Sequence, residues 1–104
     1  MKFKIPLSGK TILTLMRNCG YAPEIQDLKT DQLRFRRLLT GRPYPKFHVY
    51  CALSPDEKTA ILHLHLDQKR PSYKGTHAHS GEYEGPLLET EVDRIQRISL
   101  HNMI

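Results

Sequence analysis

The chain has 104 residues, of which 38% are hydrophobic, and it carries a formal net charge of +5 at pH 7. This length predicts a single domain, residues 1–104, and two widely spaced cysteines are too few for a disulfide framework, so we expect reduced thiols. No apolar stretch approaches the roughly 20 residues of a membrane helix, and the N-terminus lacks the apolar core of a signal peptide. We therefore expect a cytoplasmic protein with no membrane partner.

The first predicted element is a helix over residues 8–19. Ser8 is a favourable N-cap, because its hydroxyl can accept a hydrogen bond from a backbone N–H of the first turn. One apolar stripe follows at steps of three and four residues, formed by Ile12, Leu15, Met16 and Cys19. Gly20 is suited to ending the helix. Residues 21–32 are ambiguous between a short irregular strand and a loop, since Pro23 argues against a central strand.

Alternating side chains predict three strands, at residues 33–39, 46–52 and 61–67. The glycine and prolines of residues 40–45 indicate a loop between the first two strands. The turn residues at 54–58 then join the second and third strands as an antiparallel hairpin.

The third strand has the clearest alternation in the chain. Its leucines, Leu62, Leu64 and Leu66, share one face, and His63 and His65 share the other. A half-buried strand separates its two faces, so we expect the leucines to be buried and the histidines to be more exposed.

Residues 68–85 have no periodicity and predict a long histidine-rich loop, a feature that is often functional in a compact domain. Pro86 is well placed to begin a second helix, whose apolar stripe is Leu88, Val92, Ile95 and Ile98. The predicted fold is therefore α+β, in the order helix, three-stranded antiparallel sheet, helix. Both helices are expected on one face of the sheet. The other face would carry Arg34, Arg36, His48, His63 and His65.

Clustered cations favour nucleic acid as a partner, because basic surfaces bind phosphate backbones. The candidate RNA-binding residues are Lys10, Arg34, Arg36, Arg37, Lys69, Arg70 and Lys74. A histidine can also act as general acid or base on an RNA 2′-hydroxyl without a metal. His77 and His79 are the candidates for this role, and no cofactor is needed for it.

The histidines suggest a second hypothesis, a metal-binding protein or small metalloenzyme. His63, His65 and Asp67 point to the same face of a strand, and imidazoles two residues apart can share one metal ion. The candidate ligands on this hypothesis are His63, His65, His77, His79 and Glu82. A third hypothesis is a protein–protein interaction module, and the histidines are then a polar strand face and an exposed loop.

Residues 4–13, Lys-Ile-Pro-Leu-Ser-Gly-Lys-Thr-Ile-Leu, and residues 18–21, Asn-Cys-Gly-Tyr, resemble the start of the HicA (YcfA-type) toxin family. The resemblance implies a fold like the double-stranded RNA-binding domain, RNA as a partner, mRNA interferase activity and an antitoxin-type protein partner. In that family a Gly-Ser-His segment supplies the histidine associated with RNA cleavage. Its counterpart here is residues 30–32, where Gln32 stands in place of the histidine.

Glutamine cannot take up and return a proton near neutral pH. We therefore predict a small cytoplasmic RNA-binding protein that resembles HicA-type toxins, with absent or altered activity as a metal-independent endoribonuclease.

Overall fold

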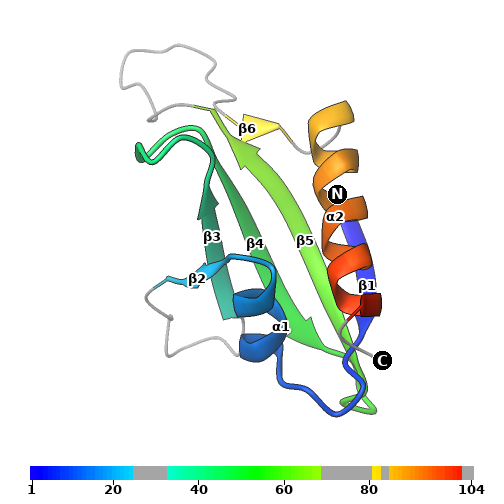
Figure 1. The fold of residues 1–104 in the computed structure, drawn as a ribbon. Coiled ribbons are helices and arrows are strands. Elements are labelled where there is room, and N and C mark those ends of the chain that lie inside the picture. The colour runs from blue at the N-terminus through cyan, green and yellow to red at the C-terminus, as the bar shows by residue number, and fades with distance from the viewer. Residues whose placement is uncertain (25–32, 69–80, 83–84, 102–104) are drawn as a thin grey trace.

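The structure is a computed structural model that describes residues 1–24, 33–68, 81–82 and 85–101 (Figure 1). The elements in chain order are β1 (Lys2–Pro6), α1 (Ile12–Asn18), β2 (Ala22–Pro23), β3 (Leu33–Leu38), β4 (Lys46–Leu53), β5 (Thr59–Asp67), β6 (Gly81–Glu82) and α2 (Pro86–His101). The strands form one sheet in the order β1-β5-β4-β3-β2, and β6 also pairs with β5. Every pairing is antiparallel.

The predicted order of helix, three-stranded sheet and helix is wrong, and so is the fold like the double-stranded RNA-binding domain. The three predicted strands are present as β3, β4 and β5, but β1 precedes the first helix and β2 and β6 extend the sheet. β1 pairs along β5 from Lys2 opposite His63 to Pro6 opposite Thr59. An alternation over only five residues does not distinguish a strand from a loop. Residues 2–6 form a strand because their backbone N–H and C=O groups pair with those along the edge of β5.

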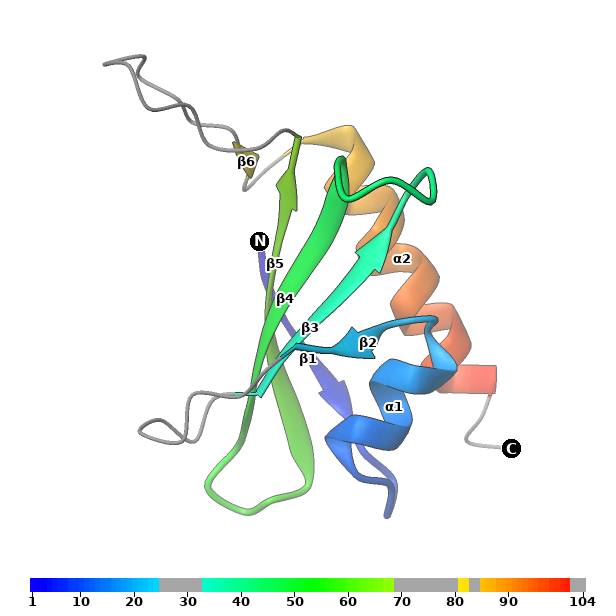
Figure 2. The same ribbon diagram turned by 90° about the vertical axis from the view of Figure 1, so that its left-hand side faces the viewer.

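The two helices lie on the same side of the sheet, as Figure 2 shows. Between the helices and the sheet lies one hydrophobic cluster, to which both helices and four of the strands contribute. Leu62, Leu64 and Leu66 of β5 are at most 3% exposed, which confirms the predicted leucine face. Leu88 and Ile95 of α2 are fully buried in the same cluster.

Helix α1 begins at Ile12, four residues later than predicted, and its N-cap is Thr11 rather than Ser8. The Thr11 hydroxyl accepts a hydrogen bond of 3.1 Å from the backbone N–H of Thr14. Ser8 and Gly9 have positive φ angles of 52° and 83°, so they turn the chain from β1 towards the helix. A residue in the left-handed region cannot have the extended geometry of an N-cap.

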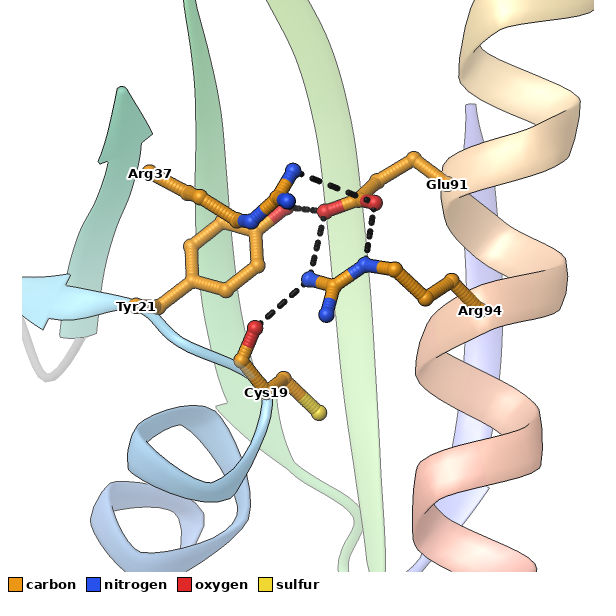
Figure 3. A network of polar contacts seen from close by, with 5 residues as sticks. All are labelled: Cys19, Tyr21, Arg37, Glu91 and Arg94. Carbon is orange, nitrogen blue, oxygen red and sulfur yellow. Dashed lines mark hydrogen bonds and ion pairs between the residues drawn. The ribbon is translucent and has the colours of Figure 1, made fainter. Parts of the chain in front are cut away.

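A buried carboxylate joins the two helices and the sheet (Figure 3). Glu91 of α2 is 3% exposed and accepts hydrogen bonds from Tyr21 Oη at 2.6 Å and from Arg94 Nε at 2.7 Å. Arg94 Nη2 also donates to the Cys19 carbonyl at 2.6 Å, just beyond the end of α1. Arg37 of β3 adds an ion pair of 3.6 Å to Glu91. This network fixes the position of α2 against the end of α1.

Among the residues that the structure describes, neither helix combines the length and apolar character needed to cross a bilayer.

Candidate metal centre

The side of the sheet opposite the two helices has rows of mostly polar side chains, which the strand register aligns. We call it the helix-free face. One row consists of Arg36, His48 and His65, on β3, β4 and β5. The adjacent rows contain Arg34, Tyr50 and His63 on one side and Leu38, Lys46 and Asp67 on the other. The hydrophobic side chains that alternate with them, such as Phe35, Val49 and Leu64, are buried on the helix side.

Two imidazoles and a carboxylate meet on the helix-free face, near the end of β4 and β5 that lies away from the hairpin turn. His65 Nε2 lies 3.1 Å from His48 Nδ1. Asp67 has one oxygen 3.6 Å from His48 Nδ1 and the other 3.5 Å from His65 Nε2. One ligand atom from each of the three residues lies within 4.8 Å of the other two. Within the described ranges, this is the only group of three or more His, Cys, Asp or Glu residues so arranged.

These separations suit a single bound metal ion. Nitrogen and oxygen ligands lie about 2.1 Å from zinc, so two of them in a tetrahedral shell are about 3.4 Å apart. The two imidazole nitrogens are 3.1 Å apart, close to that value, and each has an Asp67 oxygen at 3.5 or 3.6 Å, although the two nitrogens face different oxygens of the carboxylate. Two imidazoles and one carboxylate are also a common ligand set for transition-metal dications.

Glu24 lies behind His48, on the side away from the other two ligands. Its Oε1 is 3.1 Å from His48 Nε2. Both atoms are buried, and neither has a hydrogen-bond partner in spite of this short separation. A metal-binding histidine usually presents its second ring nitrogen to a carboxylate, which fixes the tautomer and the ring orientation. Glu24 is in the position of such an outer carboxylate.

Burial lowers the pKa of His48, although the carboxylates of Glu24 and Asp67 oppose this effect. Burial also lowers the pKa of His65, and the nearby Asp67 again opposes it. Both imidazoles therefore favour the neutral form, which is the form that binds a metal.

The two histidines of β5 differ in exposure. His63 is exposed, as predicted, whereas His65 is 9% exposed, which is more than the neighbouring leucines but still buried. The His65 ring stacks on Tyr50, with 5.5 Å between ring centroids, and packs against His48 at 4.7 Å. Both neighbours come from β4, so the burial of His65 depends on the pairing of β4 with β5.

Of the predicted metal ligands, only His65 belongs to this group, and its neighbours in the group are His48 and Asp67. His63 is on the same face but outside this group. His77 and His79 lie outside the described residues. Glu82 is in β6, where its backbone pairs with Leu66.

The predicted RNA-binding residues lie in different parts of the molecule. Arg34 and Arg36 are on the helix-free face, whereas Arg37 points to the helix side and pairs with Glu91. Lys10 precedes α1. Lys69, Arg70, Lys74 and Gln32 lie outside the described residues.

Sequence reasoning placed His48 and Asp67 on the correct face but did not include them among the metal ligands. Their contact requires the register that sets His48 opposite His65 and Lys46 opposite Asp67. Glu24 had no signal in the sequence, because it is a single acidic residue after a two-residue strand.

No protein-family model, no curated protein and no solved structure matches the chain. The resemblance of residues 4–21 to the HicA family therefore stays a prediction.

Proposed function

We propose that this protein binds a divalent transition-metal ion through His48 Nδ1, His65 Nε2 and Asp67. The observation that supports the proposal is the convergence of these three ligand groups, at separations of 3.1 to 3.6 Å. Two residues of β5 and one of β4 supply the ligands, so a rigid antiparallel pair holds them in place. Sites on paired strands keep their geometry better than sites on loops.

Zinc is the ion we propose for the site. Imidazole nitrogen and carboxylate oxygen are both zinc ligands, and zinc accepts a shell of three protein groups with one further position for water or another ligand. The Glu24 carboxylate beside His48 Nε2 favours a proton on that nitrogen, which leaves the Nδ1 lone pair for the ion. The simpler alternative is a hydrogen-bonded histidine pair on a polar strand face.

Isothermal titration calorimetry of chelator-treated protein with zinc distinguishes a metal site from a hydrogen-bonded histidine pair. We expect one site per chain, and we expect His48→Ala, His65→Ala and Asp67→Asn each to abolish measurable binding. Glu24→Gln should weaken binding by about 10- to 100-fold, the usual effect of losing an outer carboxylate.

His63→Ala is the matched control, since His63 is on the same strand and face but outside the group. It should bind zinc as the unmodified protein does. Absence of zinc binding, or loss of binding in His63→Ala alone, would reject the proposed site.

RNA binding across the helix-free face is a second candidate. It is favoured by the number of cations there: Lys2 and Lys4 of β1 and Arg36 of β3 are exposed on the same side as His63. The resemblance of the N-terminal residues to HicA toxins points in the same direction, and an antitoxin-type partner belongs to this candidate. The cytoplasm is the compartment we propose for both, in keeping with two buried cysteines that form no disulfide.

Fluorescence anisotropy with a labelled oligoribonucleotide tests this candidate in chelator. Arg36→Ala and Lys4→Ala should weaken binding and each reduce the salt slope by about 0.7, the value per phosphate contact on a single strand. Arg97→Ala is the control, because it removes the same charge from α2, where Arg97 pairs with Asp93 at 2.9 Å. Equal losses in all three variants would indicate a general charge effect and count against a binding face.

A further inference from the structure

The helix-free face combines the proposed metal group with basic side chains in adjacent register positions. Arg36 is directly opposite His48, which is itself opposite His65. Lys46 is directly opposite Asp67. Opposed residues in an antiparallel pair have Cα atoms about 4.5 to 5.5 Å apart, a distance that a lysine or arginine side chain easily exceeds. The Arg36 side chain is therefore long enough to reach the space in front of the metal group, and the Lys46 ammonium lies beside it, over the Tyr44 ring at 5.1 Å from the ring centroid.

The protein ligands leave room for an additional ligand on the ion. Three protein groups do not complete a tetrahedral shell, so at least one coordination position remains for an outside molecule. The side chains of His48, His65 and Asp67 retain 12%, 11% and 24% exposure, so the group is not sealed from solvent.

The charges around the group favour an anion in that position. The carboxylates of Asp67 and Glu24 together offset the two positive charges of a dication. The charges of Lys46 and Arg34 act on His48 and oppose its protonation, and Arg36 lies opposite His48 in the register, so a positive excess remains around the site. A bound anion would gain from this excess without displacing a protein ligand.

On the basis of the proposed metal site, we infer that the metal and Arg36 together bind a phosphate ester. One phosphate oxygen occupies the open position on the ion, and others accept hydrogen bonds from the Arg36 guanidinium. A guanidinium presents paired N–H donors that match phosphate oxygens, and a metal ion polarises the oxygen that it binds. Lys46 adds a point charge from the row of Asp67.

The ester can come from a free nucleotide, whose phosphate has three terminal oxygens, or from an RNA backbone, whose phosphodiester has two non-bridging oxygens. Protein loaded with cobalt(II) provides a direct readout, because a ligand that enters the metal shell changes the visible absorption. We would titrate it with adenosine 5′-monophosphate and, separately, with an oligoribonucleotide that lacks terminal phosphates.

We expect the cobalt spectrum to change with at least one probe, and the probe that changes it identifies the source of the phosphate. Arg36→Ala should weaken this effect by about 10-fold or more, comparable to the loss of one charged hydrogen-bond pair. Arg97→Ala should leave it unchanged. Arg36 is exposed on the sheet, so its removal should leave the fold intact, as circular dichroism would verify.

The experiment distinguishes failure of the phosphate inference from failure of the metal site. Cobalt binding with no spectral response to either probe would overturn the phosphate inference and leave the metal site standing. A response that persists in Arg36→Ala would also overturn it. Absence of cobalt binding would overturn the metal site and the inference together.

Discussion

At the scale of single residues, the exposure of a side chain depends on what the neighbouring elements pack against it. His63 and His65 are two positions apart and on the same face, yet one is exposed and the other is buried. The difference comes from β4, where Tyr50 and His48 pack against His65. Glu91 is a similar case, because a carboxylate on a helix would ordinarily be solvated, and here Tyr21 and Arg94 hold it in the interior.

Replacing Tyr21 by phenylalanine should destabilise the protein by about 1.5 to 3 kcal/mol. The hydroxyl donates a 2.6 Å hydrogen bond to the buried Glu91 carboxylate, and hydrogen bonds to charged groups contribute about that much. Burial and the adjacent Glu91 carboxylate also raise the pKa of Tyr21, so the donor proton stays in place. Urea denaturation measures the free energy of unfolding.

Tyr44→Phe is the matched control, because the Tyr44 hydroxyl is not part of the network of Figure 3. The variant keeps the aromatic ring, whose centroid lies 5.1 Å from Lys46 Nζ. Its effect should stay within about 0.5 kcal/mol. Similar losses in both variants would mean that the buried network contributes little.

At the scale of elements, periodicity identified the middle and the end of the chain better than its beginning. Helix α2 begins at Pro86, as predicted, and β4 and β5 form the predicted hairpin. The start of α1 was predicted at a serine, and the structure assigns the cap to Thr11. Both residues have the right chemistry, and only the backbone conformation distinguishes them.

Thr11→Ala should therefore reduce stability by about 1 kcal/mol, the usual effect of losing an N-cap. Ser8→Ala should change it by less than about 0.5 kcal/mol, because Ser8 is outside the helix with a positive φ angle. Thermal and urea unfolding of the two variants provide the comparison. The reverse order of effects would place the cap at Ser8 and contradict the observed start of α1.

At the scale of the whole molecule, a single core encloses both cysteines. Burial raises the pKa of the Cys51 thiol to about 12, and burial also raises the pKa of Cys19. An unfolded thiol has a pKa of roughly 8.5. Above that pH the unfolded chain releases protons that the folded protein keeps, so stability should fall as pH rises through this range.

We expect the free energy of unfolding to decrease by about 1 kcal/mol from about pH 8 to about pH 9.5 on account of Cys51. Urea denaturation at each pH measures this decrease. It should be smaller in Cys51→Ala, which has no thiol to titrate at that position. An identical pH dependence in the variant would show that other groups cause it.

Metal binding should also affect the whole fold, because the proposed ligands connect β4 and β5, two neighbouring strands of the sheet. An ion that binds only the folded state stabilises it by about 2.7 kcal/mol at a hundredfold excess over its dissociation constant. Zinc should therefore raise the melting temperature of the unmodified protein and of His63→Ala. His48→Ala should show no rise, and a rise of equal size in that variant would place the ion elsewhere.

The sequence by itself determined the strands β3 to β5, the hairpin, the final helix and the face on which His48 and His65 lie. Those features follow from local periodicity and turn chemistry, which a short window of residues contains. The tertiary structure decided that residues 2–6 form a strand, that Glu91 is buried, and that His48, His65 and Asp67 form one group with Glu24 behind it. Each of these depends on a partner distant in the chain, and pairing and burial are properties of the folded molecule.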